Sequence, residues 1–77
     1  MSGGMPKSFL VSAMWDAEAR VFTSQSDIPG LVVEAETFEE FVELVRGLAP
    51  EVIAANLPSE RGPHKLRIET RFDLAVA

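Results

Sequence analysis

The amino-acid sequence predicts an α+β fold, a two-layer sandwich in which one helix covers one face of an antiparallel-rich sheet. Three observations indicate this class. Short β-branched or aromatic segments come first, a Pro-Gly turn and a capped helix start follow at Pro29 and Thr37, and an alternating segment comes last. The predicted order is strand, strand, strand, helix, strand (β-β-β-α-β), which folds as two layers.

The first half of the chain is predicted to be a β-meander. Residues 9–15 and 20–26 have the length and composition of strands, and residues 16–19 between them fit a hairpin loop. A third strand is expected over about 31–35, because Leu-Val-Val is typical of a short buried strand.

A turn and a helix cap flank the third strand. Pro29 presets the backbone angle at the second position of a β-turn, and Gly30 supplies the left-handed angle that a type II turn needs next. Asp27 opens the turn, where its carboxylate can accept a nearby backbone N–H. Thr37 and Glu40 form a capping box, in which each side chain accepts a hydrogen bond from a backbone N–H. We interpret these five residues as structural.

The predicted helix begins at Phe38 and carries one apolar stripe for the sheet. The stripe consists of residues spaced by three and four: Phe38, Phe41, Val42, Val45, Leu48, Ala49 and Val52. Pro50 lies inside this pattern, where it removes a backbone donor and clashes with the preceding turn. We therefore expect the helix to be kinked or split there, with Pro50 in a new first turn.

The last segment alternates between two kinds of residue, as a half-buried strand does. One side carries His64, Leu66, Ile68, Thr70 and Phe72, and the other carries Lys65, Arg67, Glu69, Arg71 and Asp73. The basic residues of the second row are typical of edge protection, because charged side chains discourage unwanted strand pairing. The alternative is that these residues form a docking strip for an acidic partner or for RNA. The RNA hypothesis is the weaker of the two, because no exposed aromatic residues interleave with the basic ones.

The first strand is apolar on both faces. One side carries Phe9, Val11, Ala13 and Trp15, and the other carries Leu10 and Met14. One helical layer covers one face, so we expect a homo-oligomer or another protein to cover part of the other. Trp15 suits a boundary between packed and wet surface, and we assign it, with Lys65, Arg67 and Arg71, to a possible partner surface.

Composition narrows the class of protein further. The 77 residues predict one domain over residues 8–77 after a flexible tail over residues 1–7. The chain has no cysteine, which excludes disulfides and thiolate metal sites. A net charge of −5 makes direct nucleic-acid binding unfavourable. The apolar run 9–15 is too short for a membrane span, and nothing marks the chain as secreted, so we expect a cytoplasmic protein.

The sequence offers little that could carry chemistry. His64 is the only histidine, and no second imidazole or thiol completes a metal or nucleophile site. Asp16, Asp27 and Asp73 could be tried as a metal-dependent nuclease site, but each has a local role in a turn or a solvent-facing row. We predict no catalytic, cofactor or metal site.

Two motifs resemble those of the HicB-like antitoxin domain family. Residues 26–30 read Ser-Asp-Ile-Pro-Gly and residues 36–40 read Glu-Thr-Phe-Glu-Glu, after a strand pair and before a single helix. The similarity covers about residues 9–57. Small stand-alone relatives of unassigned function share an opening matched here by Val11, Ala13, Trp15, Asp16, Glu18 and Ala19.

The resemblance implies a truncated RNase H-like sheet and the role of neutralising a small RNA-cleaving toxin by covering its active surface. The acidic row Glu36, Glu39, Glu40 and Glu43 could then meet a basic toxin, or could simply be a solvated helix face. Many family members carry a DNA-binding piece after this domain, and this chain stops at Ala77, so we expect no direct operator binding. The alternative function is a small enzyme or a ligand-binding domain on the same scaffold.

Overall fold

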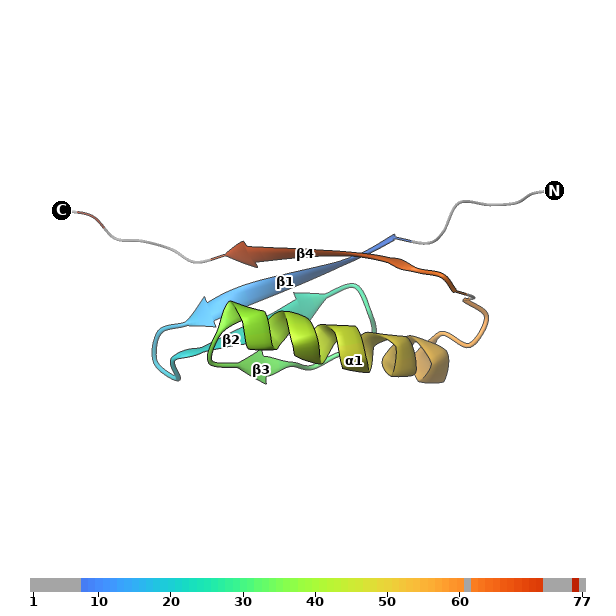
Figure 1. Cartoon of the computed structure of the whole chain (residues 1–77), viewed down its shortest axis with the longest axis horizontal. Coiled ribbons are helices and arrows are strands. Elements are labelled where there is room, and N and C mark those ends of the chain that lie inside the picture. Colours follow the sequence, from blue (N-terminus) through green and yellow to red (C-terminus); the bar gives the residue numbers. More distant parts are fainter. Residues whose placement is uncertain (1–7, 61, 72–75, 77) are drawn as a thin grey trace.

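The chain folds into a four-stranded sheet with one helix on one face, as Figure 1 shows. The computed structural model describes residues 8–60, 62–71 and 76. Its elements are β1 (Ser8–Asp16), β2 (Val21–Ser26), β3 (Glu34–Ala35), α1 (Phe38–Asn56) and β4 (Lys65–Arg71). The predicted β-β-β-α-β order and the α+β class are confirmed. The predicted tail over residues 1–7, and Phe72 and Asp73 of the last strand, lie outside the described residues.

The strands lie in the order β3-β2-β1-β4. The β1–β2 and β2–β3 pairs are antiparallel, which is the predicted meander, and β1 pairs with β4 in parallel. A parallel neighbour needs a crossover connection, and α1 supplies it between β3 and β4. The sheet is therefore mixed, with its antiparallel part formed by consecutive strands.

The core lies between α1 and one face of the sheet. Phe41, Val45, Ala49 and Ile53 of α1 are buried, and so are Phe9, Val11, Ala13, Ile28, Leu31, Val33 and Ala35. The four helix residues are spaced by four, so they form one line along the helix. Leu48, which the predicted stripe included, is 38% exposed on the flank of this line, and Ile53 occupies a buried position that the stripe left out.

Helix α1 runs without interruption from Phe38 to Asn56, so the split expected at Pro50 is wrong. Pro50 is exposed, and Arg46, whose carbonyl loses its partner one turn earlier, is exposed too. A carbonyl freed on the solvent side of a helix can bind water, which is where helices tolerate such distortion. Continuous burial of Val45, Ala49 and Ile53 on the sheet-facing side keeps both halves of the helix on the sheet.

The third strand is shorter than predicted, because β3 holds only Glu34–Ala35. The preceding segment is held by Ser24 instead of a regular strand ladder. The Ser24 N–H donates a hydrogen bond to the Val33 carbonyl at 3.0 Å. The Ser24 hydroxyl accepts a hydrogen bond from the Val33 N–H at 2.8 Å and donates one to the Leu31 carbonyl at 3.3 Å. Leu31 and Val33 are buried while Val32 is 78% exposed, so the alternation of a strand persists ahead of Glu34, where β3 begins.

Short-range contacts fix both turns. In the hairpin, the Asp16 carboxylate accepts hydrogen bonds from the backbone N–H groups of Glu18 and Ala19. Arg20 has a φ of 61° in this turn, so the second strand begins one residue later than predicted, at Val21. At the second turn, Gly30 has a φ of 84° and the Leu31 N–H donates to the Ile28 carbonyl at 3.2 Å, which is the predicted geometry.

The helix start keeps one half of the predicted capping box. The Glu40 N–H donates a hydrogen bond to the Thr37 hydroxyl oxygen at 3.1 Å. The Glu40 carboxylate accepts from the Thr37 hydroxyl at 3.3 Å, where the box predicted a backbone N–H as the donor. Within the described part of the chain, no helix is both long and apolar enough to cross a membrane.

Candidate functional site

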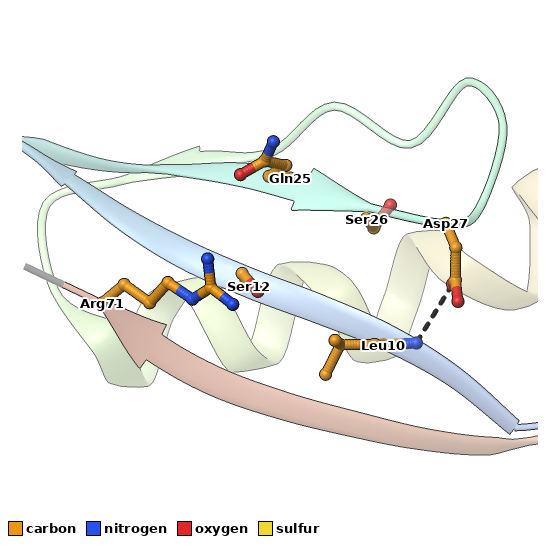
Figure 2. A pocket seen from close by; sticks show the side chains of 6 residues that line it. All are labelled: Leu10, Ser12, Gln25, Ser26, Asp27 and Arg71. Atoms are coloured by element: carbon orange, nitrogen blue, oxygen red, sulfur yellow. Dashed lines mark hydrogen bonds between the residues drawn. The ribbon is translucent and has the colours of Figure 1, made fainter.

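The face of the sheet turned away from α1 presents a polar surface, and we call it the open face. Strand alternation and register place these residues on it: Leu10, Ser12, Met14, Thr23, Gln25, Lys65, Arg67, Glu69 and Arg71. A shallow hollow of about 320 Å³ lies here, lined by Leu10, Ser12, Gln25, Ser26, Asp27 and Arg71. Figure 2 shows these side chains over β1, β2 and β4, with the helix behind the sheet.

Glu69 forms the ion pair found in the described part of the open face. Its Oε2 accepts a hydrogen bond from the Ser12 hydroxyl at 3.3 Å and another from Arg71 Nε at 3.1 Å. The Arg71 and Glu69 side chains are 59% and 37% exposed, so water screens the ion pair and it adds little stability. Its effect is positional, because it holds Arg71 over β1 beside Ser12 (Figure 2).

Asp27 closes one end of the hollow. Its Oδ1 accepts a hydrogen bond from the Leu10 N–H at 3.0 Å, drawn as a dashed line in Figure 2. The within-turn contact predicted for Asp27 is made by Ser26, whose hydroxyl oxygen accepts from the Ile28 N–H at 3.3 Å. Asp27 therefore bonds to the neighbouring strand instead of its own turn, and sequence reasoning could not see a partner 17 positions away.

The four residues assigned to a partner surface do not share one face. Lys65, Arg67 and Arg71 lie on the open face. Trp15 lies on the helix side instead, because it is two residues after the buried Ala13 in the same strand. The Trp15 ring contacts Phe22 edge to face, with centroids 4.9 Å apart. Two further contacts, Phe22 with Phe38 at 6.1 Å and Phe38 with Phe41 at 6.4 Å, continue this line of rings into the core. Trp15 is thus the outer end of an aromatic row.

The solvent side of α1 is a second surface, which we call the acidic helix surface. It consists of Glu36, just before the helix, and of Glu39, Glu40, Glu43, Leu44, Arg46, Leu48 and Glu51, all exposed. A hollow of about 360 Å³ is lined by Glu39, Glu40, Glu43 and Leu44. Leu44 is 40% exposed and Leu48 38% exposed, so two large apolar side chains lie among carboxylates. The sequence reasoning missed this, because it assigned Leu48 to the core and gave Leu44 no role.

Groups able to carry chemistry are scattered. Asp16 and Asp27 lie at opposite ends of the β1–β2 hairpin, and Asp73 is outside the described residues. Among the residues that the structure describes, no three His, Asp or Glu side chains gather as metal ligands. The His64 ring packs edge to face against Phe9 at 5.6 Å, and its buried Nδ1 has no hydrogen-bond partner among the described residues.

The fold and these surfaces define a small α+β domain with one helix on a mixed four-stranded sheet. Residues 8–76 match the family described as Domain of unknown function (DUF1902), and the chain belongs to that family. It is also similar to the crystal structure of a hypothetical protein from the extremely thermophilic bacterium Thermus thermophilus. The two are 35% identical with a TM-score of 0.78, over 91% of this chain and 100% of that chain. No curated protein matches.

Proposed function

We propose that this domain is a non-catalytic protein-interaction module that resembles a HicB-type antitoxin and acts in the cytoplasm. Its partner would be a small, basic, RNA-cleaving toxin, which it would neutralise by covering the toxin's active surface. The motifs at residues 26–30 and 36–40 support the proposal, because they form the turn and the helix start that the resemblance implies. The sheet, compared above with a truncated RNase H fold, would be retained for its surface.

The acidic helix surface carries the proposal. An apolar centre with a charged rim is the usual anatomy of a protein interface. Leu44 lines a hollow with Glu39, Glu40 and Glu43, and the exposed Leu48 lies one helical turn further on. The surface charge agrees in sign with the net charge of −5, so both would steer a basic partner toward the domain. Glu43 makes only a long, exposed contact with Arg46, at 3.9 Å, and is therefore available to a partner.

The alternative function, a small enzyme or ligand-binding domain, would use the hollow on the open face. Asp27 and Arg71 put opposite charges at its two ends, which is an arrangement that could orient a small polar molecule. We favour the protein partner, because the hollow is shallow and the carboxylates near it are already engaged by Leu10, Ser12 and Arg71.

Co-expression with a small basic protein, if one is encoded beside this chain, tests the proposal. We expect the two proteins to co-purify, with an affinity that falls as salt is raised. The variants Glu43→Lys and Leu44→Lys should weaken the complex at least tenfold in calorimetry. Lys65→Glu, a charge reversal on the open face, is the matched control and should leave the affinity unchanged. Equal weakening by the control would indicate that the interface lies on the open face. If the two proteins do not bind at micromolar concentration, the proposal is wrong.

A further inference from the structure

Strand β4 forms a free edge of the sheet, because the order β3-β2-β1-β4 gives it one neighbour. Seven residues, Lys65–Arg71, therefore carry an outward row of backbone N–H and C=O groups with no strand beside them in the described chain. The edge at β3 is only two residues long. A long free edge is a template for another strand, and the sheet offers it at β4.

The helix side of β4 is incompletely covered. In Figure 1, α1 lies along β2 and β3, while β4 is beyond β1 on the far side of the sheet. Leu66 and Ile68, which point to the helix side, remain half-buried, although they pack against the core. This row holds no charge and β4 holds no proline, two devices by which edge strands prevent pairing. A neighbouring strand would bury both apolar side chains further.

The charges of the open-face row of β4 favour pairing with a second copy of the same strand. The row holds Lys65, Arg67, Glu69 and Arg71. When two such strands pair antiparallel about a twofold axis at Ile68, Arg67 lies opposite Glu69 of the other copy, twice, next to the axis. The like-charged Lys65 and Arg71 then meet at the strand ends, where water screens them. A shift of two residues places either Arg67 or Glu69 opposite itself at the axis. The Arg67-centred register also pairs Lys65 with Glu69, but its like charges meet in the middle of the strand pair instead of at the strand ends, where water screens them.

We propose that a second copy of this chain pairs its β4 antiparallel with β4, centred on Ile68, so that the dimer has one continuous eight-stranded sheet. The pairing uses the β4 edge and leaves the acidic helix surface outside the interface. It therefore goes beyond the proposed function, and each can fail without the other. The charged row is then the device that sets partner and register, in addition to protecting the edge from other strands.

Charge reversal and its compensation test the pairing by sedimentation velocity. We expect the parent chain to be a dimer at tens of micromolar, a common range for specific complexes. Glu69→Lys and Arg67→Glu each put like charges opposite one another and should weaken the dimer at least tenfold. The double variant Arg67→Glu/Glu69→Lys restores opposite charges and should recover the dimer. Glu43→Lys on α1 changes charge by the same amount as Glu69→Lys and should leave the dimer unchanged.

A cross-link tests the register. The natural chain has no cysteine, so a single Ile68→Cys would meet only its symmetry mate, at a Cα separation of about 4.5 to 5.5 Å that a disulfide can span. We expect covalent dimers on mild oxidation. Val32→Cys is the control. Val32 is exposed and lies next to β3, at the other edge of the sheet, so this variant should not cross-link. A monomeric parent chain, loss of the dimer in the double variant, or cross-linking at Val32 alone would each overturn the proposal.

Discussion

Asp27 and Leu10 are joined by two hydrogen bonds that extend the β1–β2 hairpin past its last strand pair. The Leu10 N–H donates to Asp27 Oδ1 at 3.0 Å, and the Asp27 N–H donates to the Leu10 carbonyl at 3.3 Å. The side chain thus supplies an acceptor where the chain leaves β2 for the Pro29 turn. The pair fixes both the end of the sheet and the direction in which the turn departs.

Replacing Asp27 with Ala should destabilise the fold, because the Leu10 N–H loses a charged acceptor. We expect a loss of about 1 to 2 kcal/mol in the free energy of unfolding by denaturant titration. Asp27→Asn keeps an acceptor oxygen of the same shape and should cost less. If Asp27→Ala is as stable as the parent chain, then water replaces the carboxylate fully and the contact is not structural.

Gly30→Val should damage folding, because Gly30 has a positive φ, which a β-branched residue resists, and the Asn56 side chain would have to move. A Cβ there would lie 2.5 Å from Asn56 Nδ2, which donates a hydrogen bond to the Pro29 carbonyl. The backbone strain alone costs roughly 1 to 2 kcal/mol, so we expect melting to fall by at least about 4 °C in calorimetry.

Gly47→Ala is the matched control for Gly30, because a Cβ at Gly47 meets nothing within 4 Å. It should raise stability by up to about 1 kcal/mol, since alanine is the better helix former. A Gly30→Val variant that melts like the parent chain but loses its partner would show that the turn is functional, against our structural interpretation.

Pro50→Ala should stabilise the protein. Alanine restores a backbone N–H that can donate to the Arg46 carbonyl, and in a helix interior it is favoured over proline by up to about 3 kcal/mol. Pro50 is exposed, so the substitution removes no core contact. Denaturant titration should show a higher midpoint with an unchanged slope. An unchanged midpoint would mean that α1 has already adapted to the proline at no cost.

The purified chain should not cleave RNA, with or without magnesium or manganese. Two-metal phosphoryl chemistry needs carboxylates that converge on ions about 4 Å apart. Asp16 and Asp27 are separated by the length of the hairpin, roughly 20 Å at the usual rise per strand residue. Metal-dependent cleavage that disappears in Asp16→Asn or Asp27→Asn would contradict this, whereas cleavage insensitive to both would indicate a contaminant.

Local signals predicted most of the fold. The angle at Gly30, the hydrogen bond at Thr37 and the alternation from Lys65 to Ile68 each depend on residues within a few positions, so a single sequence contains the information. Thr70 breaks the predicted alternation by being exposed at the end of β4.

The features that sequence could not supply are long-range. The Asp27 contact with Leu10 and the Ser12 contact with Glu69 join residues 17 and 57 positions apart. The tolerance of α1 for Pro50 depends on which side of the helix faces water. The acidic row of the helix could be predicted from the sequence, but the exposure of Leu48 beside it could not, because a stripe read at threes and fours does not say where its edges lie and Ile53 is buried in its place.

The aromatic row that ends at Trp15 gives the protein its own optical probe. Trp15 is the sole tryptophan and the chain has no tyrosine, so its emission arises from one ring. That ring contacts Phe22 of β2, which in turn contacts Phe38 in the first turn of α1. Its fluorescence therefore reports how the start of the helix is seated on the hairpin, from a position that neither the β4 edge nor the acidic helix surface includes.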